Sequence, residues 1–167
     1  KSIEERPEVV EQRTRLGDWE VDLMVGKDHQ GVLVTLTERK SRFTLLRRAA
    51  SKQAKLVSQA IVDLLKWVSA LESITADNGK EFAAHQYTSQ TLSVEFYFAH
   101  PYSSWERGTN ENTNGLIRQY VPKGSDIRTL TNEQIEHIMD RLNNRPRKSL
   151  GFLTPNEVFY ERKKLTG

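Results

Sequence analysis

Three carboxylates in this chain have the types and surroundings that metal-assisted chemistry needs. Asp22 lies between apolar neighbours, Asp77 opens the turn sequence Asp77-Asn78-Gly79, and Glu111 follows Asp77 after 33 intervening residues. Carboxylate oxygens are hard ligands of the kind that Mg²⁺ and Mn²⁺ prefer. Two such ions, held by three carboxylates, would activate the attacking and leaving oxygens of a phosphodiester. Asp22, Asp77 and Glu111 are therefore the candidate catalytic residues and metal ligands.

Asp22 belongs to a predicted strand, residues 18–26. Side chains alternate along a strand, so Asp18, Glu20 and Asp22 share one face. The other face is apolar and carries Trp19, Val21, Leu23 and Val25. A partly buried carboxylate is costly unless a metal or a buried Arg compensates its charge, and both explanations stay open here. Glu20, about 7 Å along the same face, could support Asp22 or act as a spare ligand.

Asp77 ends a short predicted strand, residues 73–76. Ligands and metals bind preferentially at the carboxyl ends of strands in α/β sheets. The alternative is an ordinary Asp-Asn-Gly turn with no function.

Glu111 falls on a predicted helix, residues 109–121, whose polar face also carries Asn114, Gly115 and Arg118. The opposite face carries Thr113, Leu116, Ile117 and Tyr120 and would pack on the sheet. We expect Asn114 and Arg118 to contact DNA phosphates, with Gly115 allowing close approach of another backbone. The alternative is an exposed polar face. Glu106 is the rival third acid.

The remaining pattern predicts the elements that position these residues. After the first strand we expect strands at 32–36 and 43–46, a helix at 52–68 capped by Ser51, a helix at 80–90 and a strand at 94–98. A capping box of Thr131 with Gln134 predicts a helix at 132–143, and Thr154-Pro155 predicts the start of a last one. The order predicts a mixed α/β sheet covered by helices.

Composition narrows the class of protein. The chain has 167 residues and no cysteine, which excludes disulfides, zinc–thiolate sites and a cysteine nucleophile. It has no apolar run long enough for a membrane span and no signal-peptide pattern. A net charge of +3 permits a nucleic-acid partner, and basic residues cluster at Arg47-Arg48, Arg145-Pro146-Arg147-Lys148 and Arg162-Lys163-Lys164.

Because the chain starts at Lys1, we expect a fragment, with 1–16 a linker or arm from an upstream region and 17–167 the core.

Four ordered motifs resemble bacterial insertion-sequence transposases with a retroviral-integrase-type catalytic core. The motifs are Trp19-x-x-Asp22; Asp77-Asn78-Gly79 with Phe82; Pro101-Tyr102, Gly108, Glu111 and Asn114; and Asn143-x-Arg145-Pro146, Leu150-Gly151 and Thr154-Pro155. The run from Trp105 to Tyr120 is similar to that group almost residue for residue. The resemblance covers about residues 16–160.

The resemblance implies a ribonuclease H-like α/β fold, a mixed five-stranded sheet flanked by helices. It implies two Mg²⁺ or Mn²⁺ ions at Asp22, Asp77 and Glu111, DNA cleavage at transposon ends, and strand transfer of the 3′-hydroxyl into target DNA. It also implies DNA as partner (terminal inverted repeats and target), a homo-oligomer in the active complex, no membrane, and a bacterial cytoplasmic, nucleoid-associated location.

Two further expectations and two rival functions complete the interpretation. Arg145, Arg147 and Lys148 are candidate contacts to the DNA backbone, and Tyr102 and Trp105 are either stacking platforms or loop packing. A ribonuclease H-like nuclease or junction resolvase would share the acidic set without strand transfer. A DNA-binding or regulatory domain descended from a transposase would lack the chemistry.

Overall fold

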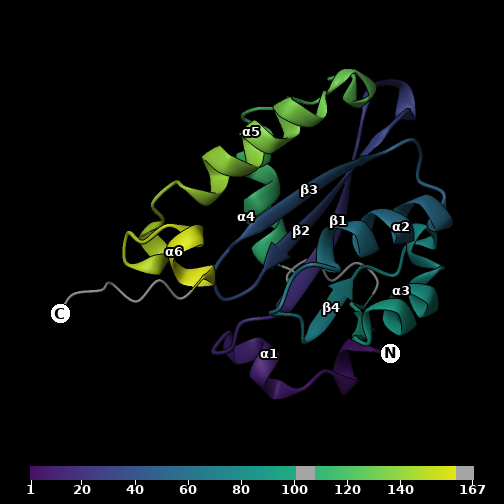
Figure 1. Cartoon of the computed structure of the whole chain (residues 1–167). Helices are drawn as coiled ribbons and strands as arrows, with labels where there is room; N and C mark the ends of the chain where they lie inside the picture. Colours follow the sequence, from purple (N-terminus) through teal and green to yellow (C-terminus); the bar gives the residue numbers. More distant parts are fainter. Residues whose placement is uncertain (101–107, 161–167) are drawn as a thin grey trace.

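A five-stranded mixed sheet forms the centre of the molecule (Figure 1). The computed structural model describes residues 1–100 and 108–160, and of Gly108, Asn110 and Glu111 it describes the backbone alone. The strands are β1 (Asp18–Val25), β2 (Val32–Glu38), β3 (Thr44–Ala49), β4 (Ser73–Ala76) and β5 (Glu95–Phe98), in the order β3-β2-β1-β4-β5. β1, β2 and β3 are antiparallel, whereas β4 and β5 run parallel to β1. The predicted strands and mixed sheet are confirmed.

The largest difference in strand length is at β3, which continues to Ala49 instead of ending at residue 46. Arg47 and Arg48 are exposed within it and pair in register with Val34 and Leu33. A strand at the edge of a sheet tolerates such residues, because long basic side chains reach solvent from a partly buried backbone.

The helices are α1 (Glu8–Gln12), α2 (Ala54–Leu65), α3 (His85–Leu92), α4 (Gly108–Ile117), α5 (Asn132–Asn143) and α6 (Pro155–Phe159). The predicted capping box before α5 is confirmed: the Thr131 hydroxyl accepts from the Gln134 amide at 3.1 Å, and the Gln134 side chain accepts from the Thr131 amide at 2.8 Å. α6 has Pro155 in its first turn, as predicted.

Two local predictions were wrong. Ser51 does not cap α2; Gln53 occupies the cap position, and the Ser51 hydroxyl accepts from the Gln53 amide at 3.3 Å in the turn before it. The helix expected at 80–90 is divided into a 3₁₀ turn at Lys80–Phe82 and then α3. Ala83 keeps helical dihedral angles, but Ala84, with φ −87° and ψ 20°, departs from them and separates the two short elements.

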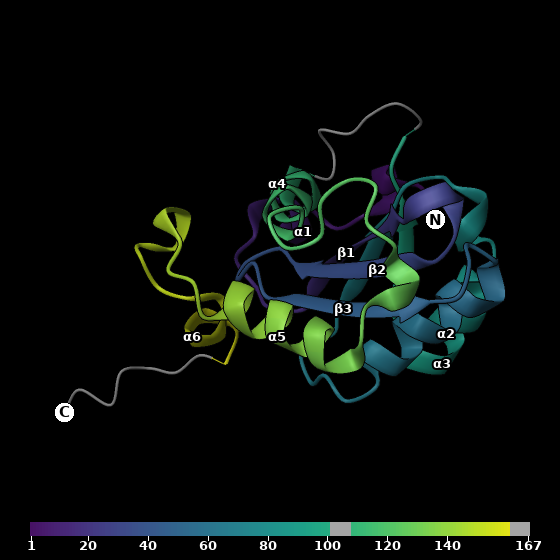
Figure 2. The same cartoon turned by 90° about the horizontal axis from the view of Figure 1, so that it is seen from above.

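Helices cover both faces of the sheet, and Figure 2 shows α4 on one side of β1 and β2, with α2 and α3 on the other. The α2 face holds one apolar core, which includes Trp19, Val21, Leu36, Ile61, Leu65 and Ile74. The α4 face holds a second, which includes Met24, Leu33, Ile117, Ile135, Ile138 and Leu142. Met24 lies on the side opposite to Trp19 and Val21, so the predicted alternation along β1 is confirmed.

Residues 1–16, which we expect to be a linker or arm, contact the sheet in this structure. Ser2 forms a parallel bridge with Phe98, and the Arg6 guanidinium donates to the Thr75 hydroxyl at 3.1 Å. Val10 is fully buried, and its carbonyl accepts from Arg39 Nε at 3.1 Å. A domain boundary at residue 16 therefore stays a prediction. In the described part of the chain, none of the helices combines the length and the apolar character that crossing a membrane would take.

Candidate functional site

The register of the two central parallel strands brings Asp22 and Asp77 together. Glu20 of β1 pairs with Thr75 of β4, and Asp22 and Asp77 each follow two residues later in their chains. Adjacent strands lie about 4.8 Å apart, and residues two apart on a strand share a face. Two carboxylates that are 55 positions apart in the sequence are thus brought to the same edge of the sheet, at the carboxyl end of β4.

Asp22 is half-buried and is held by two donors that the structure describes. Its Oδ1 accepts from the Leu23 amide at 2.9 Å, and its Oδ2 accepts from Asn114 Nδ2 at 2.9 Å. Asn114 lies on α4, so this bond joins the helix to the strand. The remaining Asn114 atom, Oδ1, is buried and has no hydrogen-bond partner among the described residues. Asn114, which we expected to contact DNA, therefore lies against the first catalytic candidate.

Asp77 is oriented by the turn that follows it. Its Oδ1 accepts from the Gly79 amide at 2.9 Å. A Cβ added to Gly79 would lie 2.8 Å from that oxygen and 2.8 Å from Glu81 Oε2, so the glycine allows two carboxylates to approach the same point. Sequence reasoning missed Glu81, although its place two residues after Gly79 was a usable signal.

Glu111 lies on the backbone of α4 one turn before Asn114, and its side chain is outside the described residues. Tyr102, Trp105 and Glu106 are also outside them. That Gly115 admits another backbone stays a prediction: within the described part of the chain, a Cβ there would meet no atom within 4 Å, so the glycine leaves an open surface on α4.

The predicted DNA-contact residues fall into two groups. Arg118 is half-buried and donates to the Val121 carbonyl at 3.4 Å, just beyond the end of α4. Arg145, Arg147 and Lys148 line a separate cavity beside α4. Arg147 is only 9% exposed and donates to the Leu142 carbonyl at 2.8 Å, whereas Arg145 is exposed and donates to Gln119 Oε1 at 3.2 Å.

Glu20 lies on the face of β1 that carries Asp22, and it is fully buried. Its Oε1 is 3.3 Å from Arg39 Nη1, but the two groups are not aligned as a hydrogen bond, and neither atom has another partner among the described residues. Burial raises the pKa of Glu20, while the nearby Arg39 charge opposes that shift. The ion pair with Arg39 favours a supporting role over that of a spare ligand.

The donor atoms around Asp22 and Asp77 fit a hard divalent cation. Both carboxylates and the unpaired Asn114 Oδ1 are oxygen ligands, and the chain has no cysteine to favour a softer metal. Among the side chains that the structure describes, no three Asp, Glu or His residues converge as a complete metal site. A full set of three carboxylates would need Glu111.

Comparisons with curated proteins show which proteins the chain is similar to. No family model matches the chain. The chain is 53% identical over 158 residues to the transposase for insertion sequence element IS4351 of Bacteroides fragilis, which covers 94% of this chain and 48% of that protein. It is 44% identical to the transposase InsI for insertion sequence element IS30C of Escherichia coli, over 93% of this chain and 41% of that protein. This chain is a homologue of insertion-sequence transposases. It spans about half the length of the curated relatives that it matches.

Solved structures identify the fold of this transposase homologue. The catalytic core domain of BIV integrase matches with a TM-score of 0.67 at 20% identity, covering 86% of this chain and 93% of that one. A simian T-cell lymphotropic virus intasome structure matches with a TM-score of 0.71 at 14% identity, covering 92% and 57%. The chain has the ribonuclease H-like fold of integrase catalytic cores, as the sequence motifs predict.

Proposed function

We propose that this chain is the catalytic region of an insertion-sequence transposase, which cleaves DNA at the ends of its element and joins the freed 3′-hydroxyl to target DNA. One observation supports the proposal most: Asn114 of α4 bonds to Asp22, which follows the Glu20–Thr75 pair on β1 as Asp77 follows it on β4. The transposase relatives support it, since similarity extends over nearly the whole of this chain.

Asp22, Asp77 and Glu111 are the proposed catalytic residues and metal ligands. Helical spacing supports Glu111, because positions three apart share a helix face and Asn114 on that face reaches Asp22. Mg²⁺ or Mn²⁺, when bound as a pair, would supply charge stabilisation and an activated water. Asn114 orients Asp22, and the Gly79 amide orients Asp77.

The proposed reaction has two steps and needs no covalent protein intermediate. In the first, a water oxygen bonds to phosphorus at the element end and the bond to the 3′ oxygen breaks, which leaves a 3′-hydroxyl. In the second, that hydroxyl attacks a phosphodiester of the target and displaces its 3′ oxygen. Both are in-line displacements in which positioning and charge stabilisation supply the catalysis.

The partners in this proposal are DNA and further copies of the chain. Terminal inverted repeats and target DNA would both contact the protein, with Arg118, Arg145, Arg147 and Lys148 binding backbone phosphates. Joining two element ends calls for a homo-oligomer in the active complex. The proposed location is the cytoplasm of a bacterium, in association with the nucleoid.

The test uses a labelled duplex that ends in the terminal inverted repeat of the element, incubated with the protein in Mn²⁺. We expect nicked and joined products from the parent, and a loss of at least about 10³-fold in each of Asp22→Asn, Asp77→Asn and Glu111→Gln, since metal-based stabilisation contributes several kcal/mol. Asp63→Asn is the matched control, because Asp63 is a partly buried carboxylate on α2 that pairs with Arg47 and Lys66. Circular dichroism checks that each variant is folded.

Each of the other outcomes would indicate a different function for the protein. Nicking without joining would favour a nuclease or resolvase. Full activity in Glu111→Gln would remove Glu111 from the site and point to Glu106. A folded parent that binds the duplex but never cuts it would favour a DNA-binding descendant of a transposase.

A further inference from the structure

A cavity of about 620 Å³ lies beside α4, away from the two aspartates. Four segments that are distant in the sequence build it: the end of α1, the β2–β3 turn, α4, and the stretch after α5. Its cationic lining residues are Arg13, Arg42, Arg145, Arg147 and Lys148, and none of the lining residues that the structure describes is acidic. We call this cavity the basic groove.

α4 separates the basic groove from the candidate catalytic site. Asn112 and Leu116, one helical turn apart, line the groove, whereas Asn114 bonds to Asp22. Successive residues are about 100° apart around an α-helix, so Asn112 and Asn114 point in nearly opposite directions. A ligand in the groove would therefore lie across α4 from the carboxylates.

Like charges crowd the groove. Burial, and then the neighbouring Arg39 charge, lowers the pKa of Arg13; burial, and then Arg13, lowers the pKa of Arg42. For Arg147, burial and the Arg145 and Arg42 charges lower the pKa. The acidic groups that act on Arg13 and Arg42 are the buried Glu20 and Glu38, and burial raises the pKa of both of these. The local balance is positive, and an anion would relieve it.

Two of these cations are available to a ligand. Arg13 and Arg42 both have positive φ, 54° and 65°, at the end of α1 and in the β2–β3 turn. Within the described residues, neither guanidinium makes a hydrogen bond or ion pair. Arg147, in contrast, is fixed by the Leu142 and Arg145 carbonyls. In the groove, backbone carbonyls therefore hold Arg147 in place, whereas Arg13 and Arg42, on other segments, can form hydrogen bonds with a ligand.

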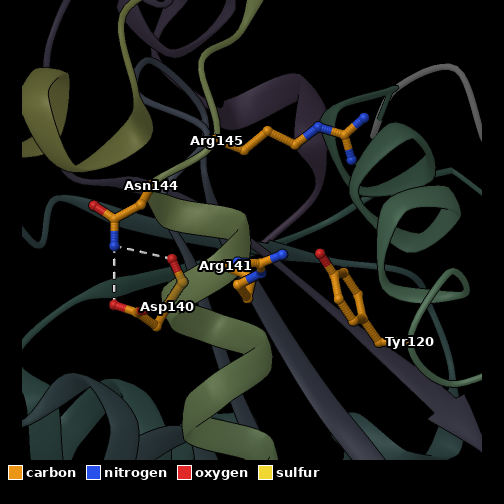
Figure 3. Close-up of a pocket in the computed structure, with 5 residues that line it drawn as sticks. All are labelled: Tyr120, Asp140, Arg141, Asn144 and Arg145. Carbon is orange, nitrogen blue, oxygen red and sulfur yellow. Dashed lines mark hydrogen bonds between the residues drawn. The ribbon is translucent and has the colours of Figure 1, made fainter.

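A second cavity continues the basic surface along α5. Its volume is about 410 Å³, and Tyr120, Asp140, Arg141, Asn144 and Arg145 line it (Figure 3). The Asp140 carboxylate accepts from Asn144 at 2.9 Å, and the Arg141 and Arg145 side chains extend to the side of the pocket where Tyr120 lies. Arg145 lines both cavities, so the cationic surface runs from Arg13 to Arg141.

We infer that the basic groove binds the phosphodiester backbone of duplex DNA across α4 from the reacting strand, with Arg13 and Arg42 as phosphate contacts. The inference rests on the proposed function for the identity of the anion. Guanidinium groups form paired hydrogen bonds with phosphate oxygens. An open groove with cations on several elements, continued by a second basic cavity, suits an extended polyanion better than one small ion.

The test is fluorescence anisotropy of a labelled 20-base-pair duplex of arbitrary sequence, titrated across a range of salt in EDTA. Arg13→Gln and Arg42→Gln keep the length of the side chain and remove its charge. Loss of one phosphate contact should reduce the slope of log K against log[salt] by about 0.9, which is about eightfold in affinity at 0.1 M salt. Lys52→Gln, at an exposed residue before α2, carries the same change of net charge and should behave as the parent. Melting temperatures near the parent's confirm folding.

Two results would overturn the inference. The first is a salt slope in Arg13→Gln and Arg42→Gln equal to that in Lys52→Gln; if the parent nicks DNA, this result rejects the groove and leaves the catalytic proposal standing. The second is displacement of the duplex by millimolar phosphate at constant ionic strength, which would indicate a site for an isolated anion. Because binding is measured without metal, a parent that binds through the groove but never nicks would reject only the catalytic proposal.

Discussion

The two faces of the central sheet both hold an apolar core, but only one of them also carries a row of buried polar side chains. Under α2, the sheet presents Trp19, Val21, Leu36 and Ile74. Under α4 and residues 1–16, the same strands present a polar face that includes Glu20, Asp22, Thr35, Thr37 and Thr75. Because side chains alternate along each strand, the same strands pack an apolar core on one face and carry the polar site on the other.

Hydrogen bonding separates the faces further. Within the described residues, the buried side-chain atoms that lack a hydrogen-bond partner belong to Glu20, Thr37, Arg39, Thr109 and Asn114. Each lies on the polar face or on a segment packed against it, and none lies on the apolar face. Unpaired buried polar groups are destabilising, so apolar packing, including the core under α2, must offset their cost.

The largest expected effect on stability comes from the apolar face. Ile61 of α2 is 1% exposed, and Ile61→Ala should lower the free energy of unfolding by about 2–5 kcal/mol because it leaves a cavity. Urea denaturation measures the loss, and Lys55→Ala at an exposed position of α2 is the control. Nicking per folded molecule should stay at the parent rate. A loss below about 1 kcal/mol would show that this face does not carry the stability.

A smaller and pH-dependent effect is expected at Glu38, the last residue of β2. Burial raises the pKa of Glu38 to about 7, although its oxygens accept from the Lys40 and Ser41 amides at 2.7 and 3.1 Å. Since the folded state holds the proton more tightly, stability is fully present below the unfolded pKa near 4.5 and is lost as the pH rises through 7.

The pH effect should amount to at most about 3 kcal/mol between pH 4.5 and 8. Urea denaturation across this range should show a flatter profile for Glu38→Gln than for the parent. Glu136→Gln, at an exposed residue of α5, should keep the parent profile. An equally steep profile in Glu38→Gln would mean that another group controls the pH dependence.

The smallest expected effect is that of replacing Asn114, on the polar face. Asn114→Ala removes the donor to Asp22 Oδ2, and we expect a loss of about 1 kcal/mol or less in stability, because Asp22 is half-exposed and water can replace the bond. Nicking should fall about tenfold, which corresponds to about 1.4 kcal/mol, since Asp22 is then less well oriented. Asn132→Ala, at an exposed residue in the first turn of α5, is the control. A parent-like nicking rate would restrict Asn114 to packing.

Some sequence predictions failed because the local pattern lacked information about neighbours. Ser51 was predicted to cap α2, but Gln53 occupies the cap position. The DNA contact at Arg147 stays a prediction: its basic neighbours did not indicate that it is 9% exposed and donates to the Leu142 carbonyl. Composition alone cannot distinguish a cation that stabilises the end of a helix from one that is free to bind a ligand.

The sequence alone determined the elements and the faces of their residues. Strand alternation around Asp22 and the capping box of Thr131 with Gln134 are set by neighbours within a few positions, where periodicity and hydrogen bonding act directly. The motifs around Asp77 and Glu111 indicated the fold by resemblance.

Only the tertiary structure decided which distant residues meet. The parallel pairing of β1 with β4 brings Asp22 and Asp77 to one edge of the sheet, the Asn114 side chain reaches Asp22 from 92 residues away, and Arg13 and Arg42 join Arg147 in one groove. These contacts depend on how strands pair and helices pack across the whole sheet. No local periodicity encodes them, because each results from burying two apolar faces at once.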